Sequence, residues 1–565
     1  MRCVRSLVLM SILMAAAMQS IALEVDPNSG CPPETSDTVR QRPGEGPPER
    51  LQPAECDPTR LPTPSASPLP GSIPVDRWRI IDALGHPDNR LDPYATNNPL
   101  KGDRPIWGPD GFSVLTLSSN SLLESRRVPT SPAAAGGPLA GQQQFFDSQT
   151  ATIDAVLYEG DTIFRPPDYQ LRITPVLNYS STSSGATRTT TTSIGAQALF
   201  FEKHLRDVSA QYDFDSVRIG IQPVTSDFRG FVLADQPLGI RFFGTRDNDI
   251  YQYSAGWFRR LPKNAARQNQ LDAGIPANDL LMANLYVQDL GKAGLTSEFV
   301  FIYDRSRARG THIVFNGANA TFTAGARHDY DVIYLGYSAD GHVGRLNLTG
   351  SVYEVIGRES PGVFTASATR VQASFAALEL SRDFDWIRIR ASGLYASGDG
   401  NPLDGQSHGF DGINQSALFA GSDSTFFIHQ RLPLVLGAID LKQRDSLFPS
   451  LRSTADTGES NFTNPGLELL GVGADLDLAP SLRVSFDVDR LMFDRTATLQ
   501  AIQGGAAVSR SIGTDASVDA IYRPFNSQNV IGRLSVGKLF PDPAARTLVG
   551  GSAPLSMFFN LVLTY

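Results

Sequence analysis

The stretch that decides the fold is LSMFFNLVLTY, residues 555–565. Apolar side chains occupy every second position, while Ser556, Asn560 and Thr564 dominate the other face. A period of two is the pattern of a strand with one apolar face. The stretch closes on an aromatic residue, Tyr565, as a strand does when its apolar face meets lipid and its last ring lies at headgroup level. A soluble edge strand is the alternative, and the rest of the chain decides between them.

The same alternation recurs from residue 112 onward, in segments of about ten to thirteen residues, long enough for a tilted strand to cross a bilayer. Short turns alternate with longer polar loops, expected at 180–193, 261–279, 305–328, 397–465, 493–510 and 541–554. A stack of soluble β-sandwiches gives no reason for that alternation. The pattern therefore predicts an all-β protein, a transmembrane antiparallel β-barrel.

The strand count follows from an even-number rule. Counted back from Tyr565, seventeen strands are evident, and a barrel with both ends in the periplasm needs an even number. The segment 111–124 is the natural addition, which gives about eighteen strands. Because Thr425–Arg444 leaves room for another hairpin, the expected range is sixteen to twenty.

The N-terminal region has a different character. Two arginines precede an apolar run at 7–18, which predicts a secretory signal peptide over 1–22; the run is too short for a membrane anchor. Residues 23–75 are rich in proline and predict a disordered periplasmic arm. Residues 76–111 form a periplasmic or plug segment, and 112–565 form the barrel. Cys31 and Cys56 are expected to form a disulfide, with two free thiols as the alternative.

Composition excludes several functions. A formal net charge of -9 makes the chain a poor candidate for nucleic-acid binding. None of the seven histidines shares a clear strand-end constellation with a serine and an acid, so no enzyme is predicted. The chain has no Cys-x-x-Cys-His sequence and attaches no haem of its own.

Three stretches carry a resemblance: NPLKGDRPI at 98–106, SDFRGF at 226–231 and SGDGNPLD at 397–404. They resemble an uncharacterised family of Gram-negative outer-membrane β-barrel proteins over residues 76–565, and more remotely the alginate-export porins. The resemblance implies an outer-membrane location and, through the second family, polysaccharide export. It supplies no catalytic residue.

Charged side chains on the polar face of the strands are expected to line the pore. The basic set is Arg172, Arg218, Arg241, Arg345, Arg388 and Arg390; the acidic set is Asp475, Asp477, Asp487, Asp489, Asp515 and Asp519. If the two sets lie on opposed walls, they produce a field across the pore that orients dipolar solutes. The alternative is that the signs are scattered by chance and merely solvate the lumen.

Several smaller features carry hypotheses. Asp227 and Arg229 lie in a loop that either constricts the pore or is an ordinary extracellular hairpin, and residues 98–106 either plug the barrel mouth or lead into its wall. Calcium is the candidate cofactor, with oxygen ligands expected from Asp399, Asn401, Asp404 and Asp411; acidic glycine-rich turns that bind no metal are the alternative. Lipopolysaccharide contact is expected at Arg305, Arg307 and Arg309, unless they are a solvated basic loop. The chain ends in a pattern that resembles the signal read by the barrel assembly machinery, and the residues expected to form it are Phe559, Leu561, Leu563 and Tyr565.

The expected function is an outer-membrane porin-like channel for hydrophilic solutes, including anionic solutes or a polysaccharide. The alternative is a barrel scaffold that sheathes or anchors a partner, such as a multihaem cytochrome or a lipoprotein. The expected partners are outer-membrane lipids and the transported solutes. A periplasmic partner could bind through the proline-rich arm.

Overall fold

The computed structural model describes the chain from residue 98 to residue 565, together with residue 89. Within that range it leaves out 130–140, 161–165, 185–186, 210–212, 264–267, 272–273, 308, 317–318, 328, 363, 416, 422–459 and 550–554. The chain divides into two units, Met1–Ile73 and Pro74–Tyr565. The signal peptide, the proline-rich arm, both cysteines of the expected disulfide and the Thr425–Arg444 segment all lie outside the described residues.

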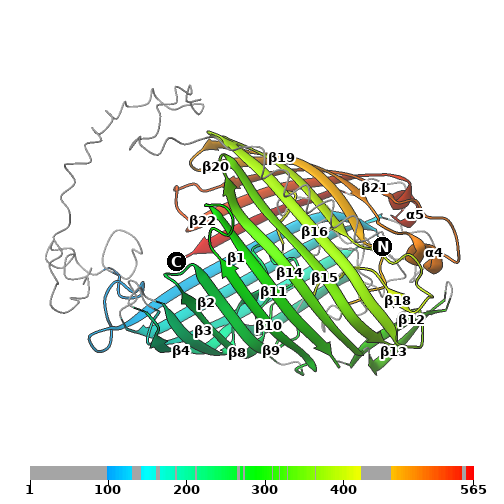
Figure 1. The fold of residues 1–565 in the computed structure, drawn as a ribbon. Coiled ribbons are helices and arrows are strands. Elements are labelled where there is room, and N and C mark those ends of the chain that lie inside the picture. Colours follow the sequence, from blue (N-terminus) through cyan, green and yellow to red (C-terminus); the bar gives the residue numbers. More distant parts are fainter. Residues whose placement is uncertain are drawn as a thin grey trace, which may run out of the picture. The chain divides into compact units, whose positions relative to one another are not determined.

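Eighteen long strands form the wall of the barrel (Figure 1). They are β1 (Gly111–Pro129), β2 (Gly141–Glu159), β3 (Tyr169–Ser184), β4 (Thr187–Asp207), β5 (Phe214–Ile221), β8 (Leu238–Arg246), β9 (Tyr251–Arg259), β10 (Asn278–Val287), β11 (Leu295–Ser306), β14 (Asp329–Val343), β15 (Leu346–Ser360), β16 (Thr369–Phe384), β17 (Ile387–Ala396), β19 (Leu467–Ala479), β20 (Leu482–Met492), β21 (Ser511–Tyr522), β22 (Val530–Pro541) and β23 (Leu555–Thr564).

Each wall strand pairs antiparallel with the next one along the chain, and β1 pairs antiparallel with β23. The first and last strands meet over Ser118↔Thr564 to Arg126↔Ser556, which closes the sheet. A closed sheet has no exposed edge with unpaired backbone groups. The prediction of a closed antiparallel barrel of about eighteen strands is therefore confirmed.

Alternation along the strands separates an inner face from an outer face. On β3, Ile173 and Leu177 are exposed, whereas Thr174, Val176 and Asn178 between and beside them are buried. The same parity leaves large apolar side chains exposed all around the wall; examples are Leu157, Ile219, Trp257, Leu281, Phe299, Leu335, Ile389, Val472, Phe486, Val518, Leu534 and Phe559. An outward apolar band with a more polar interior is the arrangement of a barrel that spans a membrane.

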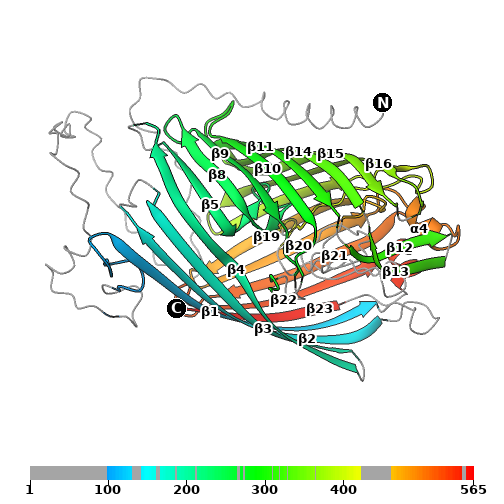
Figure 2. The same cartoon turned by 90° about the horizontal axis from the view of Figure 1, so that it is seen from below.

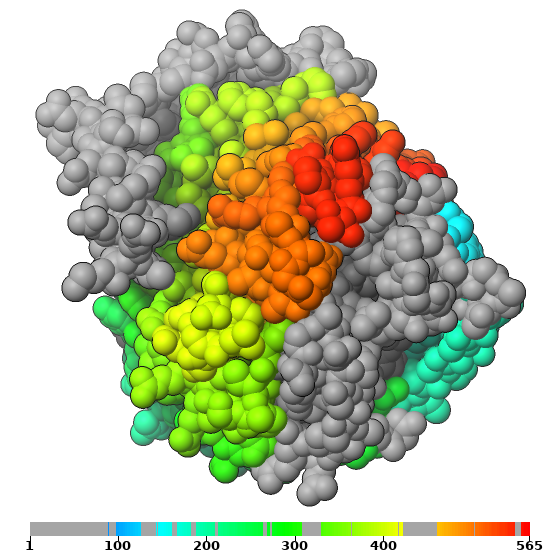
Figure 3. Space-filling model, turned by 90° about the vertical axis from the view of Figure 1, so that its right-hand side faces the viewer, coloured from blue at the N-terminus to red at the C-terminus, as the bar shows by residue number. Residues whose placement is uncertain are grey.

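The connections differ at the two ends of the barrel. At the end that carries Tyr565, which we call the turn end, the connections are short and include 247–250, 344–345, 385–386 and 480–481. At the opposite end, the loop end, lie 222–237, 260–277, 361–368, 397–466 and 493–510. Figure 3 looks at the loop end, where the residues of 397–421 (yellow), α4 (Ala497–Ile502, orange) and α5 (Pro543–Val549, red) cover much of the visible face.

Two expected loops contain additional strand structure. The expected loop 180–193 is mostly strand, because β3 and β4 extend through Ser180–Ser184 and Thr187–Ser193 with a continuous register. The expected loop 305–328 holds a separate hairpin of β12 (Arg309–Asn316) and β13 (Asn319–Arg327) (Figure 2). Among the described residues, no helix is long and apolar enough to cross a membrane.

Two loops from the loop end fold into the lumen. The loop 222–237 contains the short strands β6 (Val224–Thr225) and β7 (Ala234–Asp235), and the loop 397–421 contains β18 (Gln406–Ser407), which pairs with β16. Their apolar residues are buried with inward residues of the wall in one core cluster, which includes Phe231, Val232, Leu233, Phe410, Ile413, Phe419, Tyr334, Tyr353 and Phe375. The interior of the barrel is thus partly filled by its own loops.

Candidate functional site: the lumen and its inward loops

The loop 222–237 turns inward because of the sequence Asp227-Phe-Arg-Gly230. The Asp227 carboxylate accepts hydrogen bonds from the backbone amides of Arg229 (3.0 Å), Gly230 (2.8 Å) and Phe231 (3.1 Å). Gly230 has a φ of +74°, a conformation that side chains disfavour. The Tyr353 hydroxyl of β15 also donates to Asp227, at 2.7 Å. One carboxylate thus shapes the turn and fixes it to the wall.

Arg229 extends from this loop to the far wall. Its Nη2 lies 2.8 Å from Glu379 Oε1 on β16, and its Nη1 donates to the carbonyl oxygen of Leu418 at 2.9 Å. The strands β8, β9, β10, β11, β14 and β15 lie between this loop and β16 around the wall. A loop that begins at β5 and reaches β16 must cross the lumen. Asp227 and Arg229 therefore belong to an inward loop and not to an ordinary outer hairpin.

The two inward loops also bind each other. The Val232 carbonyl accepts hydrogen bonds from the amides of Ile413 (2.8 Å) and Asn414 (3.0 Å), and the Ala234 amide donates to the Asn414 carbonyl (2.8 Å). The Phe231 ring lies 5.0 Å from Phe375 of β16 and 5.4 Å from Phe419 of the second loop, measured between ring centroids. Backbone pairing and aromatic packing together join the two inward loops into one unit.

A buried ion cluster holds the base of the first loop. Asp235 is fully buried; Arg260 Nε lies 3.2 Å from its Oδ2, and Lys263 contacts its Oδ1. Both cations come from the next loop-end connection, 260–277. Buried charges persist in proteins only when paired. The cluster therefore joins 222–237 to 260–277.

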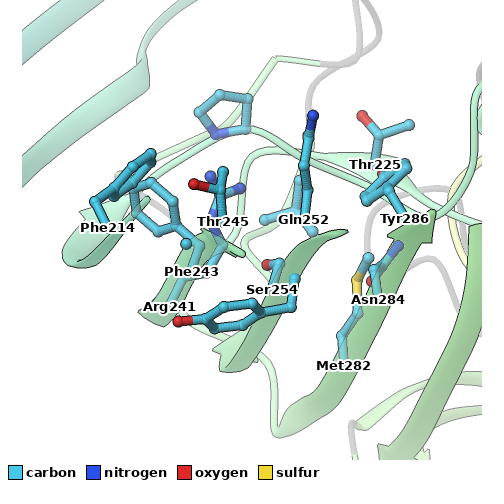
Figure 4. A pocket seen from close by; sticks show the side chains of 14 residues that line it. Phe214, Thr225, Arg241, Phe243, Thr245, Gln252, Ser254, Met282, Asn284 and Tyr286 are labelled. Atoms are coloured by element: carbon cyan, nitrogen blue, oxygen red, sulfur yellow. The ribbon is translucent and has the colours of Figure 1, made fainter. Parts of the chain in front are cut away.

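A pocket of about 360 Å³ lies on the inner wall, beside the first inward loop. It is lined by β5, β8, β9 and β10 and by residues 223–225 of that loop; its polar groups include Arg241, Ser254, Gln252 and Asn284. Figure 4 shows Arg241 and Ser254 at its base, with Phe214 and Phe243 on one side and Met282, Asn284 and Tyr286 on the other. The pocket combines one cation, several amides and hydroxyls, and aromatic surface.

Arg241 is the cation of this pocket that lacks a counter-ion. Its register partner on β5 is Arg218, whose guanidinium forms an ion pair with Glu202 on β4. Phe243 lies between the two arginines, with ring centroid distances of 5.4 Å to Arg218 Cζ and 4.7 Å to Arg241 Cζ. Within the described part of the chain, the Arg241 guanidinium makes no ion pair, and its Nε is buried without a hydrogen-bond partner. An anionic ligand would supply the negative charge that the described wall does not place beside Arg241.

The acidic side chains lie on the far side of the barrel. Asp487 and Asp489 are on β20, which is as distant from β8 in one direction around the sheet as in the other. Asp475 on β19 and Asp515 and Asp519 on β21 are the buried neighbours on the adjacent strands. Arg218 and Arg241 thus face a wall of carboxylates.

The remaining basic residues of the expected set do not face that wall. Arg390 on β17 lies 2.9 Å from Asp475 and also binds Asp487, so it belongs to the acidic wall itself. Arg388 forms an ion pair with Asp383 at the turn end, and Arg172 is held by Asp154 with distances of 2.9 and 2.8 Å. Arg345 is an exposed residue of the turn 344–345 and does not line the pore, because β15 begins only at Leu346. Asp477 is bound by Arg483 beside the short turn 480–481, away from the centre of the acidic wall.

The other expected sites are placed as follows. Asp399, Asp404 and Asp411 each accept a backbone amide within their own loop or its neighbour, and no group of three or more metal-binding side chains gathers among the described residues. Calcium binding remains a prediction.

The described residues 98–108 lie along the start of β1, with bridges Lys101↔Val114 and Trp107↔Gly111, and so lead into the wall. The assembly signal occupies β23, where Phe559 and Leu563 are exposed on the outer face.

The sequence alone does not reveal which residues bind the charged side chains of the site. These partners are Glu202, Glu379 and Tyr353. Glu379 lies 150 residues from Arg229, and Tyr353 lies 126 residues from Asp227. Glu202 is nearer to its partner Arg218, on the preceding strand, but only the register brings the two side chains together. The run Phe410 to Phe419 falls in the stretch 397–465, which the sequence predicts as a polar loop. Its apolar residues Phe410, Ile413 and Phe419 are buried, and they are the signal in the sequence that this part of the loop packs inside.

No family model matches the chain, and no curated protein matches it either. Solved structures of similar fold include three from Pseudomonas aeruginosa. OccK7 (OpdD) is 13% identical, with 80% of this chain and 99% of that chain covered and a TM-score of 0.45. OpdK with vanillate is 11% identical (80% and 98% covered, TM-score 0.42), and OccK2 (OpdF) in complex with glucuronate is 11% identical (80% and 97% covered, TM-score 0.43). At these values, the similarity carries no argument about the function of this chain. The resemblance to alginate-export porins remains a prediction.

Proposed function

We propose that the chain is an outer-membrane channel for small hydrophilic solutes, and that a carboxylate or other anionic group of the solute binds at Arg241. The observation that carries this proposal is the guanidinium of Arg241, which lines a lumenal pocket with no counter-ion from the described wall. An arginine beside another arginine on a low-dielectric wall attracts anions. The aromatic and amide groups around it suit the remainder of a small polar organic molecule.

The inward loops favour a small solute over a polymer. The loops 222–237 and 397–421 are buried in one core with the wall. A polysaccharide would have to displace both loops along its whole passage, and a sheathed protein partner would need still more room. A solute that fits a pocket of about 360 Å³ requires no such displacement. This argument also disfavours the scaffold alternative.

Single-channel recording on the purified barrel in planar bilayers tests the proposal, with gluconate and glucose as matched solutes. Gluconate is expected to interrupt the ionic current at concentrations where glucose does not. In Arg241→Gln, the gluconate concentration for half-block should rise about tenfold, as for the loss of one charge-assisted contact. Arg388→Gln is the control, because Arg388 pairs with Asp383 at the turn end of β16 and β17, and neither strand lines the pocket. A barrel that does not conduct, or a block unchanged by Arg241→Gln, would refute the proposal.

A further inference from the structure

The outer face of the wall carries a row of charged side chains near the loop end. In register across β9, β10, β11 and β14, the row reads Arg259, Asp279, Arg305 and Asp331. The signs alternate, and the neighbours pair: Arg259 lies 2.9 Å from Asp279, and Arg305 lies 3.8 Å from Asp331. Cross-strand pairs of opposite charge stabilise a sheet.

An apolar row lies directly beside the charged row, one outward position nearer the turn end. It consists of Trp257, Leu281, Tyr303, Ile333 and Ile356. Trp257, Leu281 and Ile356 are largely exposed. The charged row therefore marks the edge of the outward apolar band, which is the depth of lipid headgroups in a barrel that spans a membrane.

The alternation of positive and negative side chains along the charged row does not continue onto the next two strands, β15 and β16. The register continues from Asp331 to Arg358 on β15, and from Arg358 to Arg370 on β16. Two exposed arginines thus stand directly opposite each other on neighbouring strands. In the part of the chain that the structure describes, neither guanidinium forms an ion pair or a hydrogen bond, whereas like charges placed opposite each other destabilise a sheet.

The nearby carboxylates are already engaged. Asp331 binds Arg307 and receives the Tyr303 hydroxyl at 2.8 Å, in addition to its contact with Arg305. Glu354 lies four residues from Arg358 along β15, about 13 Å away, and accepts a hydrogen bond from Ser374 at 2.6 Å. On the other side of Arg370 lie Gln406, its register partner on β18, and His408, whose Nδ1 contacts the Gln372 carbonyl at 2.8 Å. Asp404 of the same loop accepts the Gln406 amide at 2.9 Å. Among the described residues, no carboxylate forms an ion pair with either arginine.

We propose that Arg358 and Arg370 bind a phosphate group of lipopolysaccharide in the leaflet on the loop side. The proposal rests on the outer-membrane location given under the proposed function. Guanidinium groups bind phosphate bidentately and hold it more specifically than a lysine does. A phosphate between the two arginines offsets their mutual repulsion, and the acyl chains of the same lipid cover the apolar row beside them.

The experiment measures lipid bound to the purified full-length protein by native mass spectrometry, with bisphosphorylated lipid A as the probe. The double variant Arg358→Gln/Arg370→Gln is expected to bind the lipid about tenfold or more weakly, because two charge-assisted contacts are lost. Arg259→Gln is the matched control: it removes an arginine from the same row, but one that already has its aspartate. It should retain wild-type affinity.

Two further arms identify the ligand. Dephosphorylated lipid A should bind the wild type and the double variant equally weakly, and inorganic phosphate at millimolar concentration should not compete. Equal binding of lipid A by wild type and double variant would overturn the proposal, as would competition by inorganic phosphate at that concentration. Folding of the variant is checked by its gel mobility before and after heating. Current through the double variant should be unchanged, so failure of the lipid site and failure of the channel function are separate results.

Discussion

Arg229 and Glu379 form an ion pair across the lumen, with 2.8 Å between Nη2 and Oε1. Arg229 belongs to the loop after β5 and Glu379 to β16, and the Ser392 hydroxyl also donates to Glu379, at 3.1 Å. Replacing Arg229 by glutamine should weaken the docking of the loop by about 2 kcal/mol, or about 30-fold in the docking equilibrium. Single-channel conductance should therefore rise, with more frequent transitions between open levels.

The matched control for this change is Arg483→Gln. Arg483 is also paired with a carboxylate, that of Asp477, at 2.7 Å, but this pair is more exposed and lies at a short turn. Its conductance should equal that of the wild type. If Arg229→Gln showed the same conductance as the wild type and Arg483→Gln, the loop 222–237 would not limit the current.

The buried cluster around Asp235 predicts a larger effect on the loops. Asp235→Asn leaves Arg260 and Lys263 buried without their carboxylate, which costs about 3–5 kcal/mol. Tryptic cleavage between residues 222 and 277 should accelerate about 100-fold or more if it proceeds through opened loops. The comparison is Asp383→Asn, which breaks a half-exposed pair with Arg388 and should change cleavage little. Similar cleavage of the two variants would show that the cluster does not hold the loops.

The wall of the barrel was predictable from the sequence because each strand repeats one local rule. Leu177 and Val518 are exposed because they share the apolar parity of their strands, and that parity is visible without any tertiary information. The even-number rule then completed the count with the strand at Gly111. The alternation misplaced Arg345, because the apolar–polar pattern continues through the two-residue turn 344–345. Only the strand register reveals that turn.

The interior was less predictable because it depends on contacts between distant segments. Phe231 is buried by Phe375 and Phe419, and nothing in the alternation of the strands pairs these residues. Arg241 and Arg390 look equivalent in the sequence, yet one lacks a counter-ion and the other has Asp475 and Asp487. The difference arises from which strands become neighbours and from the registry of their charges.

The closing strand predicts an effect on assembly. Tyr565 exchanges backbone hydrogen bonds with Leu117, at 2.8 and 3.2 Å, and Lys101 Nζ lies 4.3 Å from the centroid of its ring. Tyr565→Ala retains the backbone bonds but loses the ring, so less protein should reach the membrane in folded form. Conductance of the inserted molecules should be unchanged. Phe540→Ala, which removes an exposed aromatic residue near the loop end of β22, is the control, and an equal yield of both variants would contradict a special role for Tyr565.

We expect the second inward loop to respond to pH through Asp399. Burial raises the pKa of this carboxyl to about 6; its Oδ1 accepts the Asn401 amide at 2.8 Å, and its Oδ2 is buried without a partner. Because the pKa in the folded loop lies above its usual value of about 4, the packed loop favours the protonated form. The contribution of the Asp399 carboxyl to the stability of the packed loop is therefore complete below pH 4. It is lost as the pH rises through about 6, where the carboxyl ionises.

A spin label at position 403 reports this change, because the Leu403 side chain is exposed in the same loop. In Leu403→Cys, with Cys31 and Cys56 replaced by serine, the label should become more mobile as the pH rises, with a midpoint near 6. In Asp399→Asn, which cannot ionise, it should stay at its low-pH mobility throughout. A transition that persists in Asp399→Asn would assign the titration to another group, of which His408 in the same loop is the first to replace.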